Sequence, residues 1–137
     1  MSAAKQPFDK LVVVDAKPGD YEPLVAALGR DAVRVHLFST GEDALRSAET
    51  RRVKVWMVNV WLPDMSGIGL LKFIRRRLRR SAVFLVGDVY SADDELAART
   101  AGATAYVCKP PSVTWLAPYE PRCRGPIPLE QRKMTST

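Results

Sequence analysis

The segment that spans residues 53–67 constrains the fold of this chain more than any other. Its sequence is VKVWMVNVWLPDMSG. An apolar run long enough for a buried strand leads to Asn59 and then to a loop that contains Pro63 and Gly67. The pattern LLKFIRRRL follows, which is typical of a helix with one apolar side. A strand, a loop and a helix in this order indicate a parallel α/β sheet, in which ligands bind at the carboxyl ends of the strands. Asn59 falls at such an end.

Other apolar runs predict the remaining strands of this sheet. Besides Val53–Val60, we expect strands at Leu11–Val14, Val33–Phe38, Ala82–Gly87 and Thr104–Cys108, with Val33–Phe38 nearer the edge because it alternates apolar and polar residues. Helical segments separate them, which implies parallel pairing and right-handed crossovers. Five such strands fit the flavodoxin-like doubly wound α/β order 2-1-3-4-5.

Capping residues predict where the helices begin. Asp20, Thr40 and Ser91 can each accept a hydrogen bond from the first turn of a helix, and we expect these helices to end near Leu28, Arg51 and Gly102. In the helix after the third strand the apolar stripe and the outward-pointing cations separate cleanly. The stripe is Leu70, Leu71, Ile74 and Leu78, and the cations are Lys72, Arg75, Arg76 and Arg79.

Length and composition indicate one globular domain. The chain has 137 residues, 47% hydrophobic and 26% charged, and no run approaches the roughly 18 apolar residues of a membrane span. Cys108 and Cys123 match no metal-binding spacing, so a reducing cytoplasmic location is expected. The net charge of +6 permits contact with nucleic acid or an acidic partner but does not decide between them.

Prolines change the character of the chain after Pro111. Pro118, Pro121, Pro126 and Pro128 lie too close together for a long helix, and only residues 112–117 have room for a turn or two. We therefore expect a folded domain over residues 1–111 and a Pro-rich C-terminal tail over residues 112–137. The last helix of the expected fold is then shortened or missing.

Residues of functional interest follow four of the predicted strands. Asp15, Asn59, Gly87 and the Lys109–Pro110 pair each stand at a carboxyl end, within the blocks VVVDAKP, VNVWLPDMSGIGLL and AGATAYVCKP. Together these blocks make the chain resemble the response-regulator receiver domains of two-component signalling, the CheY-like family, from about Leu11 to Pro111. The resemblance implies a signalling module.

The resemblance also assigns roles to positions. In that family two acids after the first strand and a phosphoacceptor Asp after the third hold Mg²⁺, and the acceptor takes its phosphoryl group from a histidine kinase. Asp15 matches the first acid, but Ala16 stands at the second and Asn59 at the acceptor. The family's Ser or Thr on the fourth strand, which binds phosphoryl oxygens, is replaced by Gly87.

Three further positions keep the family's residue types. Lys109 matches the phosphoryl-binding Lys, and Pro110 matches a proline that follows a cis peptide bond. Tyr106 matches the aromatic switch, whose ring moves inward on activation. Because Gly87 has no hydroxyl group to couple to that movement, we expect one fixed orientation of Tyr106.

The replaced residues predict a degenerate receiver. A carboxamide has no anionic oxygen for attack on phosphorus, so phosphorylation at Asn59 should fail. Mg²⁺ prefers carboxylate ligands. Only Asp15, the neutral carbonyl of Asn59 and the Trp61 backbone remain, so we expect no cofactor and weak or lost Mg²⁺ binding.

Several readings stay open beside this one. Asp15 either pairs with Lys109, which we favour, or keeps a residual cation site. Asp64 is read as a solvated turn residue, whereas Asp88 is an alternative pocket acid. Trp61 either covers the pocket or packs on its own loop.

The function we expect is that of a stand-alone pseudo-receiver that works by phosphorylation-independent protein–protein contact and is not an enzyme. Its partner would be a histidine kinase, a downstream signalling protein or a second copy of the chain. One alternative is a receiver phosphorylated at a non-standard carboxylate. Another is a nucleic-acid-binding adaptor that uses the basic tail and an arginine run, although a solvated helix face is favoured for that run. The run is Arg75, Arg76, Arg77, Arg79 and Arg80.

Overall fold

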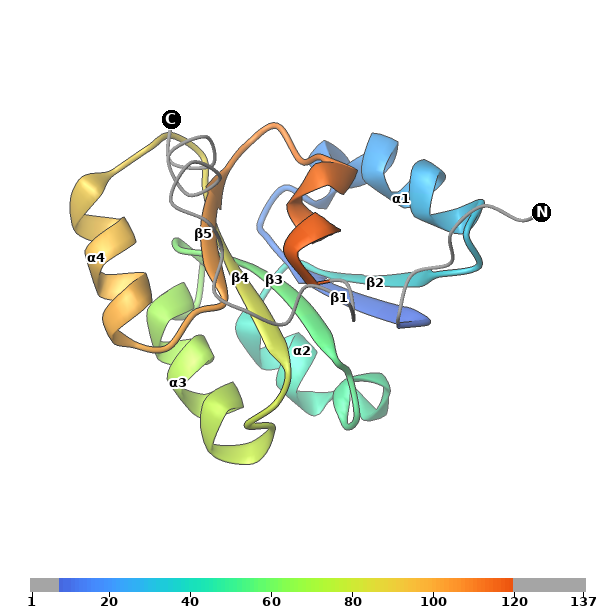
Figure 1. Ribbon diagram of the computed structural model, residues 1–137. Helices are drawn as coiled ribbons and strands as arrows, with labels where there is room; N and C mark the ends of the chain where they lie inside the picture. The colour runs from blue at the N-terminus through green and yellow to red at the C-terminus, as the bar shows by residue number, and fades with distance from the viewer. Residues whose placement is uncertain (1–7, 120–137) are drawn as a thin grey trace.

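A five-stranded parallel sheet forms the centre of the protein, in a computed structural model that describes residues 8–119. The strand order is β2-β1-β3-β4-β5, and every neighbouring pair is parallel, which confirms the expected topology (Figure 1). The strands are β1 (Lys10–Val14), β2 (Arg34–Phe38), β3 (Val55–Asn59), β4 (Ala82–Gly87) and β5 (Ala105–Cys108).

Helices cover both faces of the sheet (Figure 1). The α-helices are α1 (Glu22–Gly29), α2 (Gly41–Arg46), α3 (Gly67–Arg77) and α4 (Ala92–Thr100), and the 3-10 helices are η1 (Pro18–Tyr21), η2 (Ala48–Thr50) and η3 (Val113–Tyr119). α1 and η3 pack on one face, and α2, α3 and α4 pack on the other. No helix in the described range is long and apolar enough to cross a bilayer.

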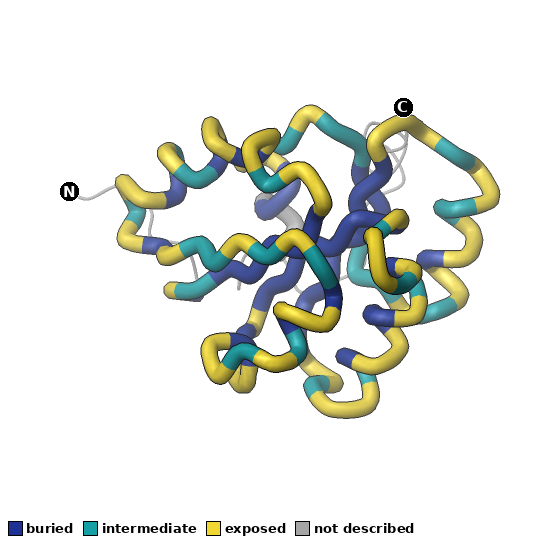
Figure 2. The backbone as a smooth tube through the Cα atoms, turned by 180° about the vertical axis from the view of Figure 1, so that it is seen from behind, coloured by how far each residue is buried: buried dark blue, intermediate teal, exposed yellow. Residues whose placement is uncertain are grey.

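Burial follows the strand pattern that the sequence predicts. Every residue of β3 and β4 is buried, as expected for central strands with a helical layer on each side (Figure 2). β2 contains no fully buried residue, which confirms its place at the edge. Three members of the predicted α3 stripe are buried, since Leu70, Leu71 and Ile74 are each 2% exposed or less. The fourth, Leu78, follows the helix as its C-cap and is only partly buried. The buried residues of α3 belong to an apolar cluster that includes residues of β3 and β4, so they hold the helix against this face of the sheet.

The expected caps are correct for two of the three helices. The Thr40 hydroxyl oxygen accepts from the Asp43 amide at 3.1 Å, and Ser91 accepts from the Asp94 amide at 3.2 Å. The prediction for Asp20 is wrong, because the N-cap of α1 is Tyr21 and makes no side-chain cap bond. The turn η1 instead carries the Asp20 carboxylate to the Lys109 ammonium, 2.7 Å away, where the two groups form a charge-assisted hydrogen bond.

Arg75 also departs from the prediction that it points into solvent. Its guanidinium donates to the carbonyl oxygen of Gly102 at 2.9 Å, to the carbonyl oxygen of Ser81, and to the Thr104 hydroxyl at 3.4 Å. These acceptors lie in the turns that precede β4 and β5. Periodicity placed Arg75 off the apolar stripe, but it could not show that neighbouring turns would present unpaired carbonyl groups to it.

The packed part of the chain runs past the expected boundary at Pro111. Trp115 is 7% exposed and Leu116 is 1% exposed, and both join the apolar cluster that contains Leu24 and Leu28 of α1. The segment after β5 is the 3-10 helix η3, in agreement with a shortened last helix. Most of the expected tail, residues 120–137, lies outside the described residues.

Candidate functional site

Four charged or polar side chains meet at the carboxyl edge of the sheet. Asp15 follows β1, Asn59 ends β3, Asp88 follows β4 and Lys109 follows β5. The Asn59 amide nitrogen lies 2.9 Å from Asp15 and 3.0 Å from Asp88, and the Lys109 ammonium lies 3.1 Å and 3.0 Å from the same two carboxylates. The predicted convergence of Asp15, Asn59 and Lys109 is therefore present in the structure.

Asp15 is the buried centre of this cluster, with 1% of its surface exposed. Its carboxylate accepts from the Lys17 amide at 2.9 Å and from the Tyr21 hydroxyl at 2.8 Å, in addition to Asn59 and Lys109. Burial and then the Asp15 charge raise the pKa of Tyr21, so the phenol stays a donor. Tyr21 was not predicted as a pocket residue, because its place there depends on the turn η1.

Asn59 uses both ends of its carboxamide. Its Nδ2 group donates to Asp15 and to Asp88, and its Oδ1 atom accepts from the Trp61 amide at 2.8 Å. An amide offers two donor hydrogens and a carbonyl acceptor, which is the combination that these three partners need. An ionised carboxylate could satisfy Trp61 but could not donate to either aspartate.

Lys109 is the cation that this cluster shares. Besides Asp15 and Asp88, its ammonium contacts Asp20 at 2.7 Å, while its side chain is only 11% exposed. Burial acts to lower the pKa of Lys109, but hydrogen bonds to Asp20, Asp88 and Asp15 outweigh it and raise the pKa above its ordinary value. The hydrogen bond from Lys109 lowers the pKa of Asp88, which keeps that carboxylate ionised. The Lys109–Pro110 peptide bond is cis.

The residues present fit a magnesium ion poorly. Asp15 already accepts from four donors, and the Lys109 ammonium lies between the carboxylates of Asp15 and Asp88, where a divalent cation would compete with it. No group of three or more His, Cys, Asp or Glu side chains within residues 8–119 is arranged to hold a metal ion. Asn59 adds only a neutral carbonyl, and that atom is occupied by Trp61.

Gly87 leaves a space that the Tyr106 side chain fills. A Cβ atom added at Gly87 would lie 2.6 Å from the Tyr106 hydroxyl oxygen and 2.9 Å from the Val89 carbonyl oxygen. The Tyr106 ring is turned inward and is 4% exposed. Its hydroxyl accepts from the Ser91 amide at 3.1 Å and donates to the Val89 carbonyl at 3.4 Å. Burial raises the pKa of Tyr106 to about 12, so the hydroxyl keeps its proton.

Asp64 and Trp61 lie in the loop between β3 and α3, and neither is among the four side chains that meet around Asp15. The Asp64 carboxylate accepts from the amides of Gly41 at 3.0 Å and Glu42 at 2.9 Å, so it caps α2 and is not a free turn residue. Trp61 is 71% exposed, so most of its surface faces solvent. Only its backbone reaches Asn59. Asp88 is the alternative acid that the structure does bring into the cluster.

Comparison with known proteins agrees with this architecture. The family description "Response regulator receiver domain" matches residues 11–117, and the chain belongs to this family. It is therefore a response-regulator receiver domain of the two-component type. A probable transcriptional regulatory protein of Mycobacterium tuberculosis, TcrX, is 32% identical over 103 residues, which cover 75% of this chain and 44% of TcrX.

Two further relatives are similar in extent. The transcriptional regulatory protein KdpE of M. tuberculosis is 35% identical over 100 residues, 73% of this chain and 44% of KdpE. The transcriptional regulatory protein PhoP of Bacillus subtilis, named for alkaline phosphatase synthesis, is 29% identical over 101 residues, 74% of this chain and 42% of PhoP. The chain spans less than half the length of these three relatives.

Solved structures give the same fold. The beryllofluoride-activated DrrB receiver domain superposes with a TM-score of 0.70 at 29% identity, covering 80% of this chain and 91% of that one. The beryllofluoride-activated NtrC4 receiver domain dimer gives a TM-score of 0.71 at 25% identity, covering 80% and 90%. The likeness includes the strand order on which the pocket depends.

Proposed function

We propose that this receiver domain acts by protein–protein contact in one standing conformation, without phosphorylation at Asn59. The observation that carries the proposal is the closed hydrogen-bond network of the Asn59 carboxamide, which joins Asp15, Asp88 and the Trp61 backbone. The role is one of binding and not of catalysis. It needs no cofactor, and Mg²⁺ binds weakly if at all.

The chemistry of the pocket supports the absence of phosphoryl transfer to Asn59. Attack on phosphorus needs an anionic oxygen, and the amide supplies none. Three carboxylates already contact the Lys109 ammonium, so a phosphoryl group would have to displace them to reach it. No hydroxyl group is present at Gly87 to hold a phosphoryl oxygen.

The inward Tyr106 ring supports a single conformation. In receiver domains this aromatic residue moves inward on activation, and here it already occupies the space that Gly87 leaves. Two hydrogen bonds hold its hydroxyl, one from Ser91 and one to Val89. The switch therefore rests in the orientation of an activated receiver, with no phosphoryl group needed to pull it inward.

An apolar surface beside Tyr106 suits contact with a protein. Tyr90 is 43% exposed and packs edge-on against the Tyr106 ring, with the ring centroids 6.0 Å apart. Val89 and Leu96 are 77% and 67% exposed. The partner is a histidine kinase or a downstream signalling protein, with a second copy of the chain as the alternative. Because the relatives are named transcriptional regulators, the output we propose is control of transcription.

A binding experiment with two glycine variants tests this proposal. The immobilised chain should retain its partner protein in equal amount whether or not acetyl phosphate and Mg²⁺ are present. Gly87→Ala, which displaces the Tyr106 ring, should lower that amount at least several-fold. Gly29→Ala is the matched control, since a Cβ atom there meets nothing within 4 Å. A partner retained only after phosphodonor treatment would contradict the proposal.

One observation favours a second candidate, a receiver phosphorylated at Asp88. This carboxylate is ionised, its side chain is 54% exposed, and it lies 3.0 Å from Lys109. One of its oxygens would attack the phosphorus of an acyl phosphate and release acetate. Intact mass after incubation with acetyl phosphate and Mg²⁺ separates the candidates, because a phosphoryl adduct that disappears in Asp88→Asn would establish this second function.

A further inference from the structure

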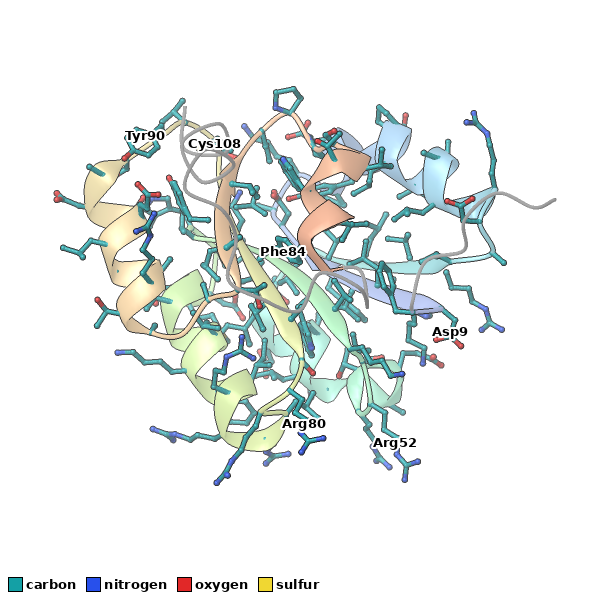
Figure 3. All side chains as sticks on the ribbon, in the orientation of Figure 1. Asp9, Arg52, Arg80, Phe84, Tyr90 and Cys108 are labelled. Carbon is teal, nitrogen blue, oxygen red and sulfur yellow. The ribbon has the colours of Figure 1, made fainter. Side chains whose placement is uncertain are left out.

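A second candidate site lies at the opposite edge of the sheet. A hollow of about 460 Å³ is lined by Arg52, Val53, Arg76, Arg77, Leu78, Arg79, Arg80 and Ser81. Val53 and Ser81 precede β3 and β4, so the hollow is at the amino ends of these strands, whereas the Asn59 pocket is at their carboxyl ends. Strands of five and six residues separate the two sites by roughly 15–20 Å. Figure 3 shows Arg52 and Arg80 at one end of the molecule and Tyr90 and Cys108 at the other.

The structure brings to this hollow an arginine that lies outside the arginine run of the sequence. Four of its arginines come from the end of α3 and the turn after it, but Arg52 comes from the segment before β3. A solvated helix face, the reading that the sequence favours, accounts for Arg76 and Arg77 in the last turn of α3, where cations complement the helix dipole. It does not account for Arg79, Arg80 and Arg52, which lie outside that helix.

The guanidinium groups of the hollow carry uncompensated charge. Among residues 8–119 none of the five arginines makes an ion pair, although Lys10, Arg46, Arg99 and Lys109 all do. The described non-ionic contact is that of Arg77, whose guanidinium stacks 4.9 Å from the Phe73 ring centroid. Five positive charges in one hollow nearly equal the net charge of +6 for the whole chain.

The shape and the residue type favour phosphate groups carried on a strand. Every cation that lines the hollow is an arginine, whose planar fork matches phosphate oxygens in pairs. The hollow is open to solvent, so the phosphate groups of a chain that lies along this surface can reach its arginines. Val53, which is 2% exposed, and Leu78 form an apolar floor that adds no competing acid.

We infer that this arginine hollow binds the phosphate backbone of a nucleic acid. Binding through the phosphate backbone is independent of sequence, because contacts to phosphate groups carry no information about the bases. It goes beyond the function proposed for the Asn59 pocket and does not depend on it, since the two sites lie at opposite edges of the sheet.

Fluorescence anisotropy with a labelled 20-base-pair DNA duplex tests this inference. If about four phosphates are neutralised, affinity should fall roughly 150-fold between about 50 and 200 mM salt, from a slope of about −0.9 per phosphate. Arg79→Ala/Arg80→Ala removes two of these contacts, so the fall should shrink to roughly 12-fold. Arg30→Ala/Arg34→Ala removes the same charge from exposed positions outside the hollow and should keep the wild-type slope.

Two outcomes of the duplex titration would each overturn the inference. No duplex binding at about 50 mM salt would do so, as would an equal loss in both double variants. Tripolyphosphate and vesicles of anionic phospholipid serve as the remaining arms. Binding of either without binding of the duplex would assign the hollow to a small polyphosphate or to a membrane surface. Circular dichroism should show both double variants folded, because all four substituted side chains are exposed.

Discussion

The hydroxyl oxygen of Tyr106 lies 2.6 Å from the position that a Cβ atom on Gly87 would occupy. Real Cβ atoms do not approach oxygen so closely, so an inward Tyr106 and any side chain at position 87 exclude each other in this arrangement. The absence of a side chain at Gly87 and the inward orientation of Tyr106 are thus parts of one packing relationship.

Gly87→Ala should destabilise the fold by about 1–3 kcal/mol, because a methyl group forced into a filled space must displace its neighbours. In a Tyr106→Phe background the nearest clashing atom is gone, and the cost of Gly87→Ala should fall. Urea unfolding of the two single variants and the double variant measures this coupling. Additive effects, with no coupling between positions 87 and 106, would show that the ring does not depend on Gly87.

Asn59→Asp should lower the free energy of unfolding by about 2–4 kcal/mol, since two donated hydrogen bonds become contacts between like charges. Asn59→Ala removes the same donors without adding a charge and should cost less. The Asn59→Asp variant should also fail to bind beryllofluoride tightly with Mg²⁺, because Ala16 and Gly87 supply no ligand. A stable Asn59→Asp protein with strong beryllofluoride binding would contradict both expectations.

Lys109→Met should destabilise the protein by about 3–5 kcal/mol, because it leaves the buried Asp15 charge without its cation. Combining it with Asp15→Asn should recover part of the loss. The raised pKa of Lys109 predicts that its contribution is complete below pH 10.5 and is lost as pH rises through the higher folded-state value. Wild-type stability should therefore decline more steeply than that of Lys109→Met in this alkaline range, as followed by urea unfolding.

Asp64→Ala should cost about 1 kcal/mol, the usual effect of removing a capping side chain. The hydrogen bond from the Glu42 amide lowers the pKa of Asp64, so its contribution is present above pH 3.8 and is lost as pH falls through the lower folded-state value. Thermal unfolding at neutral and acidic pH measures both effects. Asp9→Ala, at an exposed position, is the control and should change little.

Trp115→Ala should destabilise the domain by about 3–5 kcal/mol, as expected when a buried aromatic side chain is removed from a core. Val113 lies in the same 3-10 helix and is 43% exposed, so Val113→Ala should have little effect. Equal and small effects of the two substitutions in urea unfolding would place the end of the packed domain at Pro111 after all.

Sequence reasoning predicted the sheet and the meeting of Asp15, Asn59 and Lys109 because both depend on one rule. Apolar runs separated by helical segments make parallel strands, and the carboxyl ends of parallel strands lie at one edge. The strand boundaries then bring these residues together independently of the conformations of the loops. The shortened last helix followed from the proline spacing in the same direct way.

Residues whose roles depend on loop paths were not predictable in this way. Asp20 and Tyr21 enter the pocket through the turn η1, and Asp64 accepts hydrogen bonds from the first amides of α2. Arg75 joins two turns that are distant in sequence. In each case a polar side chain finds a partner that tertiary packing supplies, and no local spacing encodes that partner.

The most direct test of the central claim is a two-dimensional ¹H–¹⁵N spectrum of the wild-type chain with and without acetyl phosphate and Mg²⁺. The amide of Ser91 donates to the Tyr106 hydroxyl, so its resonance reports the position of the ring. If the switch already stands inward without a phosphoryl group, the Ser91 and Tyr106 resonances should be unchanged by the phosphodonor. A shift of both resonances that reverses as the phosphodonor is consumed would contradict the account.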